Sequence, residues 1–263
     1  MQFTALRSFY QFSLRILALL LLLLPALYII HSNKATGSER VAAARNSKDA
    51  LLRTLFTQKG VNYPPQQLYI RVFKSENILE VWAANKTSKV YTHIKDYPVC
   101  AMSGKLGPKR KEGDEQVPEG FYHIGNMNPY SAYHLSMLVT YPNASDRILS
   151  KHSRLGGDIY IHGNCVSIGC IAITNPLIDE LYWLTAQVRT HSQKKVPVHI
   201  FPTRLSNLKY NLLCYLYPDM PDMLRFWAGL KQGYDWFEQH KTLPVMEVNA
   251  SGFYQISNTN SQP

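Results

Sequence analysis

The chain has 263 residues, 46% of them apolar, and 28 Lys and Arg against 18 Asp and Glu give it a net charge of +10. This length can bury one sizeable core with room for one appendage, and the sequence has no repeat or low-complexity block. Because the basic residues are scattered rather than gathered into one stripe, we exclude a nucleic-acid partner and expect either a plain soluble surface or attraction to an anionic envelope polymer or membrane face.

An apolar run from Ile16 to Ile30 follows a short segment that carries only Arg7 and Arg15 as charges. This pattern is typical of an export segment, and its length lies between that of a signal peptide and that of a short membrane-spanning helix. Residues 1–35 are therefore predicted to be a cleaved signal or a retained inner-membrane anchor. Either alternative places the rest of the chain beyond the membrane, in the periplasm.

Residues 36–66 are polar with a weak helical pattern, and the prolines of "NYPPQQ" end it. We interpret this segment as a connector. From Leu68 the apolar period becomes two, which predicts three antiparallel strands separated by "KSEN" and "NKTSK". A long loop rich in Gly, Pro and charge then precedes further predicted strands at "GFYHI", "HLSMLVTYP" and "DIYIHG". In the last of these, Tyr160 and His162 are expected on one face and Ile161 on the other.

After Cys170 the sequence predicts a helix with Asn175 as its cap and Asp179 and Glu180 in its first turn. "VPVHIFPT" predicts a closing strand. Beyond Thr203 the pattern is helical, and an apolar stripe at helical spacing is expected to be core: Met223, Trp227, Leu230, Tyr234 and Phe237.

His162, Cys165 and Cys170 lie within nine residues, and three explanations are open. They could hold a metal, although no fourth ligand follows at zinc spacing. Export favours a disulfide, and Cys100 with Cys165 is the pairing to test, with Cys214 left as a buried thiol.

A cysteine nucleophile accounts for more of this stretch. Cys170 would attack a carbonyl, and His162 at a strand end would be its base. Gly169 lets substrate approach closely, and its N–H with that of Cys170 could receive an oxyanion. Ser167 could hydrogen-bond within the turn and hold its shape.

"IHGNCVSIGCIAIT" resembles the active-site motif of the L,D-transpeptidase catalytic-domain family, in which His-Gly is followed by Ser/Thr-x-Gly-Cys. "GPKRKEGDEQVPEGFYHI" resembles the strand entry upstream of that motif, with Val117 in place of a threonine. "YHLSMLVTYPNASDR" and "LKQGYDWFEQHKTLP" resemble a branch of murein transpeptidase/amidase-like envelope enzymes. The likeness runs from about Gln67 to Pro244. It departs from the family where the loop between His162 and Ser167 is shortened, and a more open cleft would suit a bulky acyl donor.

The resemblance implies an α+β fold that is mainly β, with antiparallel strands and one packed helix after the active-site cysteine. The catalytic domain would span residues 67–203, and residues 204–263 would form a C-terminal helical extension and tail.

The same resemblance implies cysteine-dependent acyl transfer on peptidoglycan, without a cofactor or metal. Cys170 would form a thioester with stem peptides that contain meso-diaminopimelate, with His162 as the base. The matching branch favours the hydrolytic direction, releasing a linked peptide or a wall-linked lipoprotein. The alternative is a non-catalytic wall-binding protein whose Cys/His cluster is structural.

Tyr160, His134 and Arg204 are secondary candidates for substrate contact. Tyr160 shares the face of His162. His134 is placed in a predicted strand with Leu135, so a structural histidine is an equal alternative. Arg204 could pair with a stem-peptide carboxylate, with a solvated charge as its alternative.

Overall fold

The computed structural model describes residues 36–86 and 88–257, and from Gly37 onward they belong to one compact unit. The apolar segment Ile16–Ile30 lies outside the described residues, and within them no helix is long and apolar enough to cross a membrane. The helices are α2 (Gly37–Gln58), α3 (Ala144–Leu149), α4 (Asn175–His191), α5 (Asn207–Leu216) and α6 (Pro221–His240). The strands are β1 (Gln67–Phe73), β2 (Ile78–Ala84), β3 (Thr92–Pro98), β4 (Gly120–Asn128), β5 (Ser136–Val139), β6 (Tyr160–His162), β7 (Ile171–Ala172), β8 (Pro197–Phe201), β9 (Met246–Val248) and β10 (Tyr254–Ile256).

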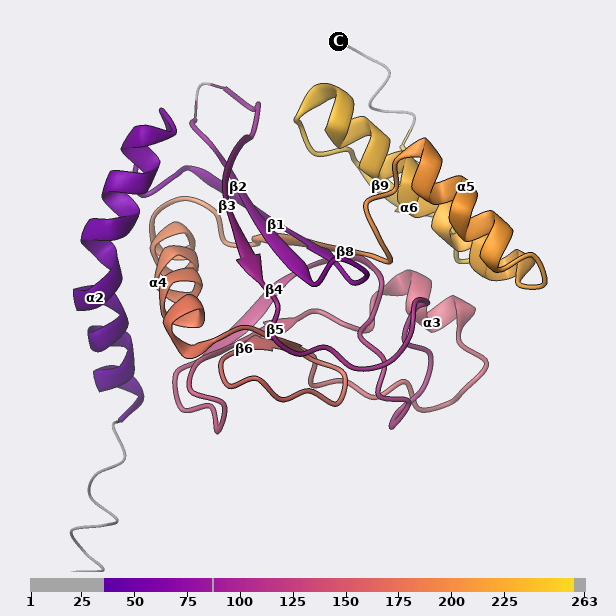
Figure 1. Ribbon diagram of the computed structural model, residues 1–263, viewed down its shortest axis with the longest axis horizontal. Helices are drawn as coiled ribbons and strands as arrows, with labels where there is room; N and C mark the ends of the chain where they lie inside the picture. The colour runs from indigo at the N-terminus through magenta and orange to yellow at the C-terminus, as the bar shows by residue number, and fades with distance from the viewer. Residues whose placement is uncertain (1–35, 87, 258–263) are drawn as a thin grey trace, which may run out of the picture. The chain divides into compact units, whose positions relative to one another are not determined.

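Eight strands form one sheet in the order β3-β2-β1-β8-β4-β5-β6-β7, and β9 pairs with β10 separately (Figure 1). The predicted α+β fold and the antiparallel β1-β2-β3 meander are confirmed. Two pairs, β1 with β8 and β6 with β7, are parallel. The alternation of side chains did not reveal these pairs, because a parallel strand and an antiparallel strand have the same period of two.

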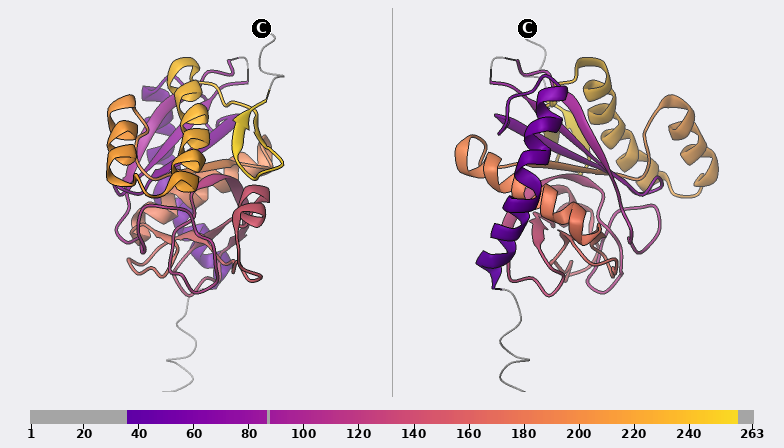
Figure 2. Two further views of the ribbon diagram at one scale, coloured as in Figure 1. Left: turned by 90° about the vertical axis from the view of Figure 1, so that its right-hand side faces the viewer. Right: turned by 60° about the vertical axis from the view of Figure 1, so that its left-hand side comes forward.

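The first strand is buried on both faces, since its alternate side chains pack into different cores. Leu68, Ile70 and Val72 join a core that includes Leu181 and Leu184 of α4. The intervening Tyr69 and Phe73 pack toward α6, where the ring of Tyr69 lies 4.9 Å from that of Phe237 and the ring of Phe73 lies 6.3 Å from that of Tyr234. The two helices therefore cover opposite faces of this part of the sheet (Figure 2).

Helix α2 occupies much of the predicted connector and packs along α4 (Figure 1). Asp49 of α2 accepts a hydrogen bond from the indole N–H of Trp183 at 2.9 Å, and the Arg45 guanidinium lies over the same indole. Leu52 and Phe56 are buried in the core that α4 shares. The helix thus belongs to the compact unit.

The predicted apolar stripe of α6 is confirmed as core. Trp227, Leu230, Tyr234 and Phe237 are buried, and Met223 is half-buried. The C-terminal extension therefore covers the sheet face that α4 leaves open.

A buried carboxylate joins α6 to the sheet. One oxygen of Glu119 accepts hydrogen bonds from the Lys74 ammonium at 2.9 Å and from the Gly107 N–H at 2.7 Å. Its other oxygen accepts from the Trp227 indole at 2.7 Å. The Lys74 ammonium also donates to the carbonyls of Gly107 and Val117, so every group in this cluster has partners. A charge buried in this way is tolerated only while its counter-charge is present.

We predict that Lys74→Met destabilises the fold by about 3–5 kcal/mol, because it leaves the Glu119 carboxylate buried without its cation. Urea unfolding at pH 7 measures this loss. Lys59→Met is the matched control, since Lys59 is exposed and its change should stay within about 0.5 kcal/mol. Equal midpoints for the two variants would contradict the assignment.

Candidate active site

The site is built where β6 and β7 lie side by side. Ile161 pairs with Ile171 and His162 with Ala172 in parallel register, so the chain returns to the start of β6 within a short loop. Parallel strands usually need a crossover of a dozen residues or more. Here the loop brings Cys170, directly before β7, next to the start of β6, two residues before His162 at its end.

A pocket of about 420 Å³ opens over this loop. It contains both His162 and Cys170, and Tyr160 lines it as the predicted alternation requires, while Ile161 is fully buried on the other face. The pocket is lined by Asn128, Ser131, Ala132, Tyr133, Ser136, Asp158, Tyr160, His162, Val166, Ser167, Ile168 and Cys170.

The thiol of Cys170 is half-buried, and its sulfur lies 3.5 Å from the carbonyl oxygen of Asp158. Burial raises the pKa of the Cys170 thiol, and the negative charge of Asp158 adds to that rise. A hydrogen bond from the Tyr160 backbone and the positive charge of Lys109 act in the opposite direction. The thiol is therefore protonated at neutral pH and needs a base before it can attack.

His162 is buried, with 2% of its surface exposed, and this burial lowers the pKa of its imidazole. Its Nδ1 lies 2.5 Å from the Gly163 carbonyl oxygen. Because a carbonyl can only accept, Nδ1 carries the proton and Nε2 holds the free lone pair. The resting His162 is a neutral base in a defined tautomer.

The loop between the two residues is fixed at several points. The disulfide between Cys165 and Cys100 is present, as the sequence suggested, and it ties the loop to the chain just after β3. The hydroxyl of Ser167 donates to the Cys170 carbonyl at 2.8 Å, which confirms its expected role in the turn. Gly169 has a φ of +133°, a conformation that other residues rarely adopt.

Two local expectations change in the structure. The Gly169 N–H, expected to receive an oxyanion, already donates to the Ser167 hydroxyl at 3.2 Å. Asn175 does not cap α4, whose N-cap is Thr174. Instead, the Asn175 side chain accepts a hydrogen bond from the Asn164 N–H at 2.8 Å and thereby holds the loop.

The acidic residues predicted for the first turn of α4 lie beyond it and are used as partners for other elements. Glu180 is buried and accepts hydrogen bonds from Lys95 and Tyr97 of β3. Asp179 lies 2.6 Å from Nε2 of His134. Tertiary partners therefore set these positions, rather than the helix dipole.

His134 does not lie in a strand, contrary to prediction. It occupies a turn with a φ of 72° before β5 begins at Ser136, and it is absent from the residues that line the pocket. Its contact with Asp179 supports the structural alternative.

Arg204 is not brought to the pocket either. Its guanidinium pairs with Glu80 and lies 4.6 Å from the ring centroid of Phe73, so its charge has an internal partner. Tyr160 does line the pocket, and its hydroxyl donates to the Asp158 carboxylate at 3.3 Å.

The metal alternative loses one of its three ligands, because Cys165 is oxidised to a disulfide with Cys100. Within residues 36–86 and 88–257, no group of three His, Cys, Asp or Glu side chains could hold a metal ion.

Two contacts between pocket residues were not predicted from the sequence. The ring of Tyr133 lies 4.8 Å from the His162 imidazole, tilted by 33°, and the Asp158 carbonyl faces the Cys170 thiol. Tyr133 is next to His134, which was named as a candidate from the sequence. Its contact, His162, is 29 residues later in the chain, and no local sequence pattern indicates that the two rings meet.

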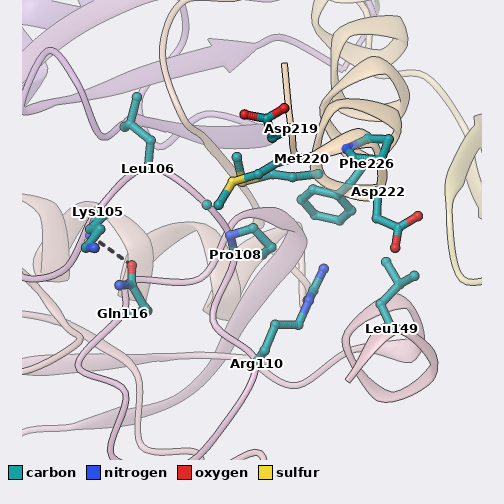
Figure 3. A pocket seen from close by; sticks show the side chains of 13 residues that line it. Lys105, Leu106, Pro108, Arg110, Gln116, Leu149, Asp219, Met220, Asp222 and Phe226 are labelled. Atoms are coloured by element: carbon teal, nitrogen blue, oxygen red, sulfur yellow. Dashed lines mark hydrogen bonds between the residues drawn. The ribbon is translucent and has the colours of Figure 1, made fainter. Parts of the chain in front are cut away.

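A second cavity, of about 520 Å³, lies between the loop before β4 and the start of α6 (Figure 3). Figure 3 shows Met220 and Phe226 on one side and Leu106, Pro108 and Arg110 on the other. Its wall residue Gln116 has a carbonyl 3.4 Å from where a Cβ on Gly169 would lie. The cavity and the active-site loop therefore share one wall.

The family model described as the L,D-transpeptidase catalytic domain matches residues 67–200. The chain is also 38% identical, over 192 residues, to the Escherichia coli (strain K12) protein named "Putative L,D-transpeptidase YafK", an alignment that covers 72% of this chain and 74% of that protein. The chain belongs to the L,D-transpeptidase catalytic domain family. Membership in this family assigns it, in general terms, to acyl transfer on cell-wall peptidoglycan.

Solved structures similar to this chain include the helical cell shape determining protein Pgp2 from Campylobacter jejuni, with a TM-score of 0.42 and 21% identity over 72% of this chain and 74% of that one. Bd1075 of Bdellovibrio bacteriovorus has a TM-score of 0.38 and 18% identity, over 70% of this chain and 78% of that one.

We predict that Cys100→Ser/Cys165→Ser lowers stability by about 2–4 kcal/mol, because the disulfide closes a loop between residues 65 apart in the sequence. Thermal melting without reductant measures it. Cys214→Ser, which removes a free thiol, is the control. The same melting temperature for the double variant and the wild type would contradict this.

We also predict that iodoacetamide alkylates Cys170 slowly at pH 7, with a rate that rises to a midpoint above pH 9.0, because burial raises the pKa of this thiol. Peptide mass spectrometry across pH 6–11 follows the modification, with glutathione as the reference thiol. A midpoint below pH 7 would show a preformed thiolate and contradict the neutral resting pair.

Proposed function

We propose that the protein is a cysteine acyltransferase of the periplasm that acts on peptidoglycan stem peptides containing meso-diaminopimelate, and that it works mainly in the hydrolytic direction. The observation that carries this proposal is the pairing, in one pocket, of a half-buried thiol with a buried neutral histidine whose free nitrogen is Nε2. The export pattern of residues 1–35 supports the location.

In the first step Cys170 Sγ attacks the carbonyl carbon beside diaminopimelate, and Nε2 of His162 takes the thiol proton. The negative charge on the carbonyl oxygen faces the Cys170 N–H, since the Gly169 N–H is engaged with Ser167. The amide C–N bond then breaks, His162 returns the proton to the leaving amine, and a thioester remains on Cys170.

In the second step water or an amine attacks the thioester, His162 takes its proton, and the sulfur leaves and is protonated. The short loop supports hydrolysis and a bulky acyl donor, because the segment between His162 and Ser167 is too short to form a long cover over the pocket. The disulfide to Cys100 and the Asn164–Asn175 hydrogen bond fix this segment in place. A peptide or lipoprotein joined to diaminopimelate is the released group that we propose.

The alternative function is a wall-binding protein whose cysteines are structural. Cys165 fits that description, because its sulfur is bonded to Cys100. Cys170 does not, because its thiol is free and reaches the pocket. The nucleophile hypothesis explains both cysteines.

We predict that the full-length protein releases diaminopimelate-linked peptides or protein from purified peptidoglycan. Cys170→Ala should abolish release, and His162→Ala should lower its rate by about 10²–10⁴-fold, because general-base catalysis contributes that much. Mass spectrometry of the products, with and without added free amino acid, shows whether water or an amine accepts the acyl group.

Cys214→Ala is the control for the loss of a thiol, and it should retain wild-type release. If the wild type and Cys170→Ala both bind the wall without altering it, the enzyme proposal fails and the binding function stands.

A further inference from the structure

The turn between β4 and β5 carries Tyr133 over the catalytic-site histidine. The ring of Tyr133 lies against the His162 imidazole, and the Tyr133 carbonyl comes within 3.0 Å of where a Cβ on Gly163 would lie. The same position would be 2.6 Å from Asn175 Oδ1 and 2.9 Å from the Ile178 side chain, so α4 and the turn together leave room only for glycine after His162. The position of the turn therefore bears directly on the imidazole and on its Gly163 hydrogen-bond partner.

The turn is held from outside by one side chain of α2. A single guanidinium nitrogen of Arg40 donates to the carbonyls of Ser131 and His134, both at 2.7 Å, and reaches the Pro129 carbonyl at 3.5 Å. These carbonyls flank Tyr133 on both sides. Arg40 is half-buried, so these bonds are protected from competition by water.

The first turn of α2 also meets the same segment. A Cβ on Gly37 would come within 2.7 Å of the Tyr130 ring, so the helix backbone lies directly against this side chain. On the far side, Asp179 of α4 holds His134. The turn is thus fixed between two helices, and Arg40 supplies the hydrogen bonds from α2.

Helix α2 lies outside residues 67–200, which match the family. We propose that Arg40 is a positioning residue for His162, acting through the turn that carries Tyr133, so that the segment before the catalytic domain completes the active site. This inference rests on the proposed role of His162 as the base. It makes the supposed connector part of the machinery that aligns that base.

Arg40 can affect His162 through the alignment and the burial of the imidazole. A base must hold one nitrogen within hydrogen-bond reach of one proton, and a misplacement of about 1 Å can cost a hundredfold in rate. Without Arg40, two buried or half-buried carbonyls lose their donor and the turn can move away from His162. The imidazole then gains contact with water and loses the ring that limits its orientation.

Several ionisable groups face His162 and must be considered in any titration. Tyr133 comes from the turn, Asp158 and Tyr160 from the β6 segment, and Cys170 from the residue before β7. Of these, only Tyr133 lies on the turn that Arg40 holds. If removing Arg40 changes the titration of His162 alone, the change therefore reports a movement of the turn that carries Tyr133.

The test compares Arg40→Ala with Arg45→Ala in the full-length protein. Both remove one arginine from α2, but Arg45 is exposed and lies over Trp183, away from the turn. We expect Arg40→Ala to lower kcat for peptide release by about tenfold to a hundredfold, with little change in KM. Arg45→Ala should match the wild type.

The second measurement does not depend on activity. The imidazole of His162 is titrated by NMR of ¹⁵N-histidine-labelled protein, with His162→Gln used to assign its signals among the nine histidines. In Arg40→Ala the His162 titration should move up toward the ordinary histidine value of about 6.5, because burial is what lowers it. Arg40→Lys should restore the wild-type midpoint, since one ammonium can replace the one nitrogen that makes all three contacts.

Unchanged His162 titration in a folded Arg40→Ala variant overturns the positioning role, whatever the activity. If Arg40→Ala is unfolded by circular dichroism, Tyr133→Ala against Tyr133→Phe tests the same link, because only the alanine removes the ring. Equal His162 titration in those two variants also overturns it. If every variant, including His162→Gln, kept wild-type activity, the proposed function itself would be refuted.

Discussion

The structure depends on the short loop that returns the chain from β6 to a parallel β7. This loop must reverse the chain within the residues between His162 and Cys170, and its geometry leaves those two side chains in one pocket. Such a tight return is unfavourable by itself, because parallel neighbours normally need a long crossover. The surrounding structure compensates for it at several points.

Each compensation comes from a different element. The disulfide to Cys100 fixes the middle of the loop, and Asn175 of α4 holds its first residues. Ser167 bonds both the Gly169 N–H and the Cys170 carbonyl, which fixes the turn that presents the thiol. The His162 imidazole is oriented by its hydrogen bond to the Gly163 carbonyl and by contact with the ring of Tyr133. A loop held this firmly can keep an acid–base pair aligned without a bound ligand.

The rest of the molecule supports this edge of the sheet from both faces. Helices α4 and α2 cover one face of β1, and α6 covers the other through apolar contacts and the Glu119 cluster. The N-terminal and C-terminal extensions are therefore not separate attachments. They supply layers of the same core, and α2 also reaches the turn beside the active site.

The sequence predicted the features that depend on local pattern. The meander, the α6 stripe and the shared face of Tyr160 and His162 follow from side-chain period, and the motif around Cys170 marked the family.

What the sequence did not predict depends on tertiary partners. His134 lies in a turn rather than the predicted strand, where its side chain contacts Asp179 and its carbonyl accepts a hydrogen bond from Arg40. Asn175 accepts a hydrogen bond from the active-site loop instead of capping α4. Arg204 forms an ion pair with Glu80 and does not line the active-site pocket. The contact between Tyr133 and His162 joins two segments that no periodicity connects.

The proposed mechanism requires that Cys170 form a thioester with a stem-peptide acyl group. The most direct measurement is the intact mass of the full-length protein after brief mixing with diaminopimelate-containing stem peptides, followed by peptide mapping. We expect an acyl adduct on Cys170 that hydroxylamine removes and that Cys170→Ala lacks. Peptide release without any adduct on Cys170, or an adduct on another residue, would contradict it.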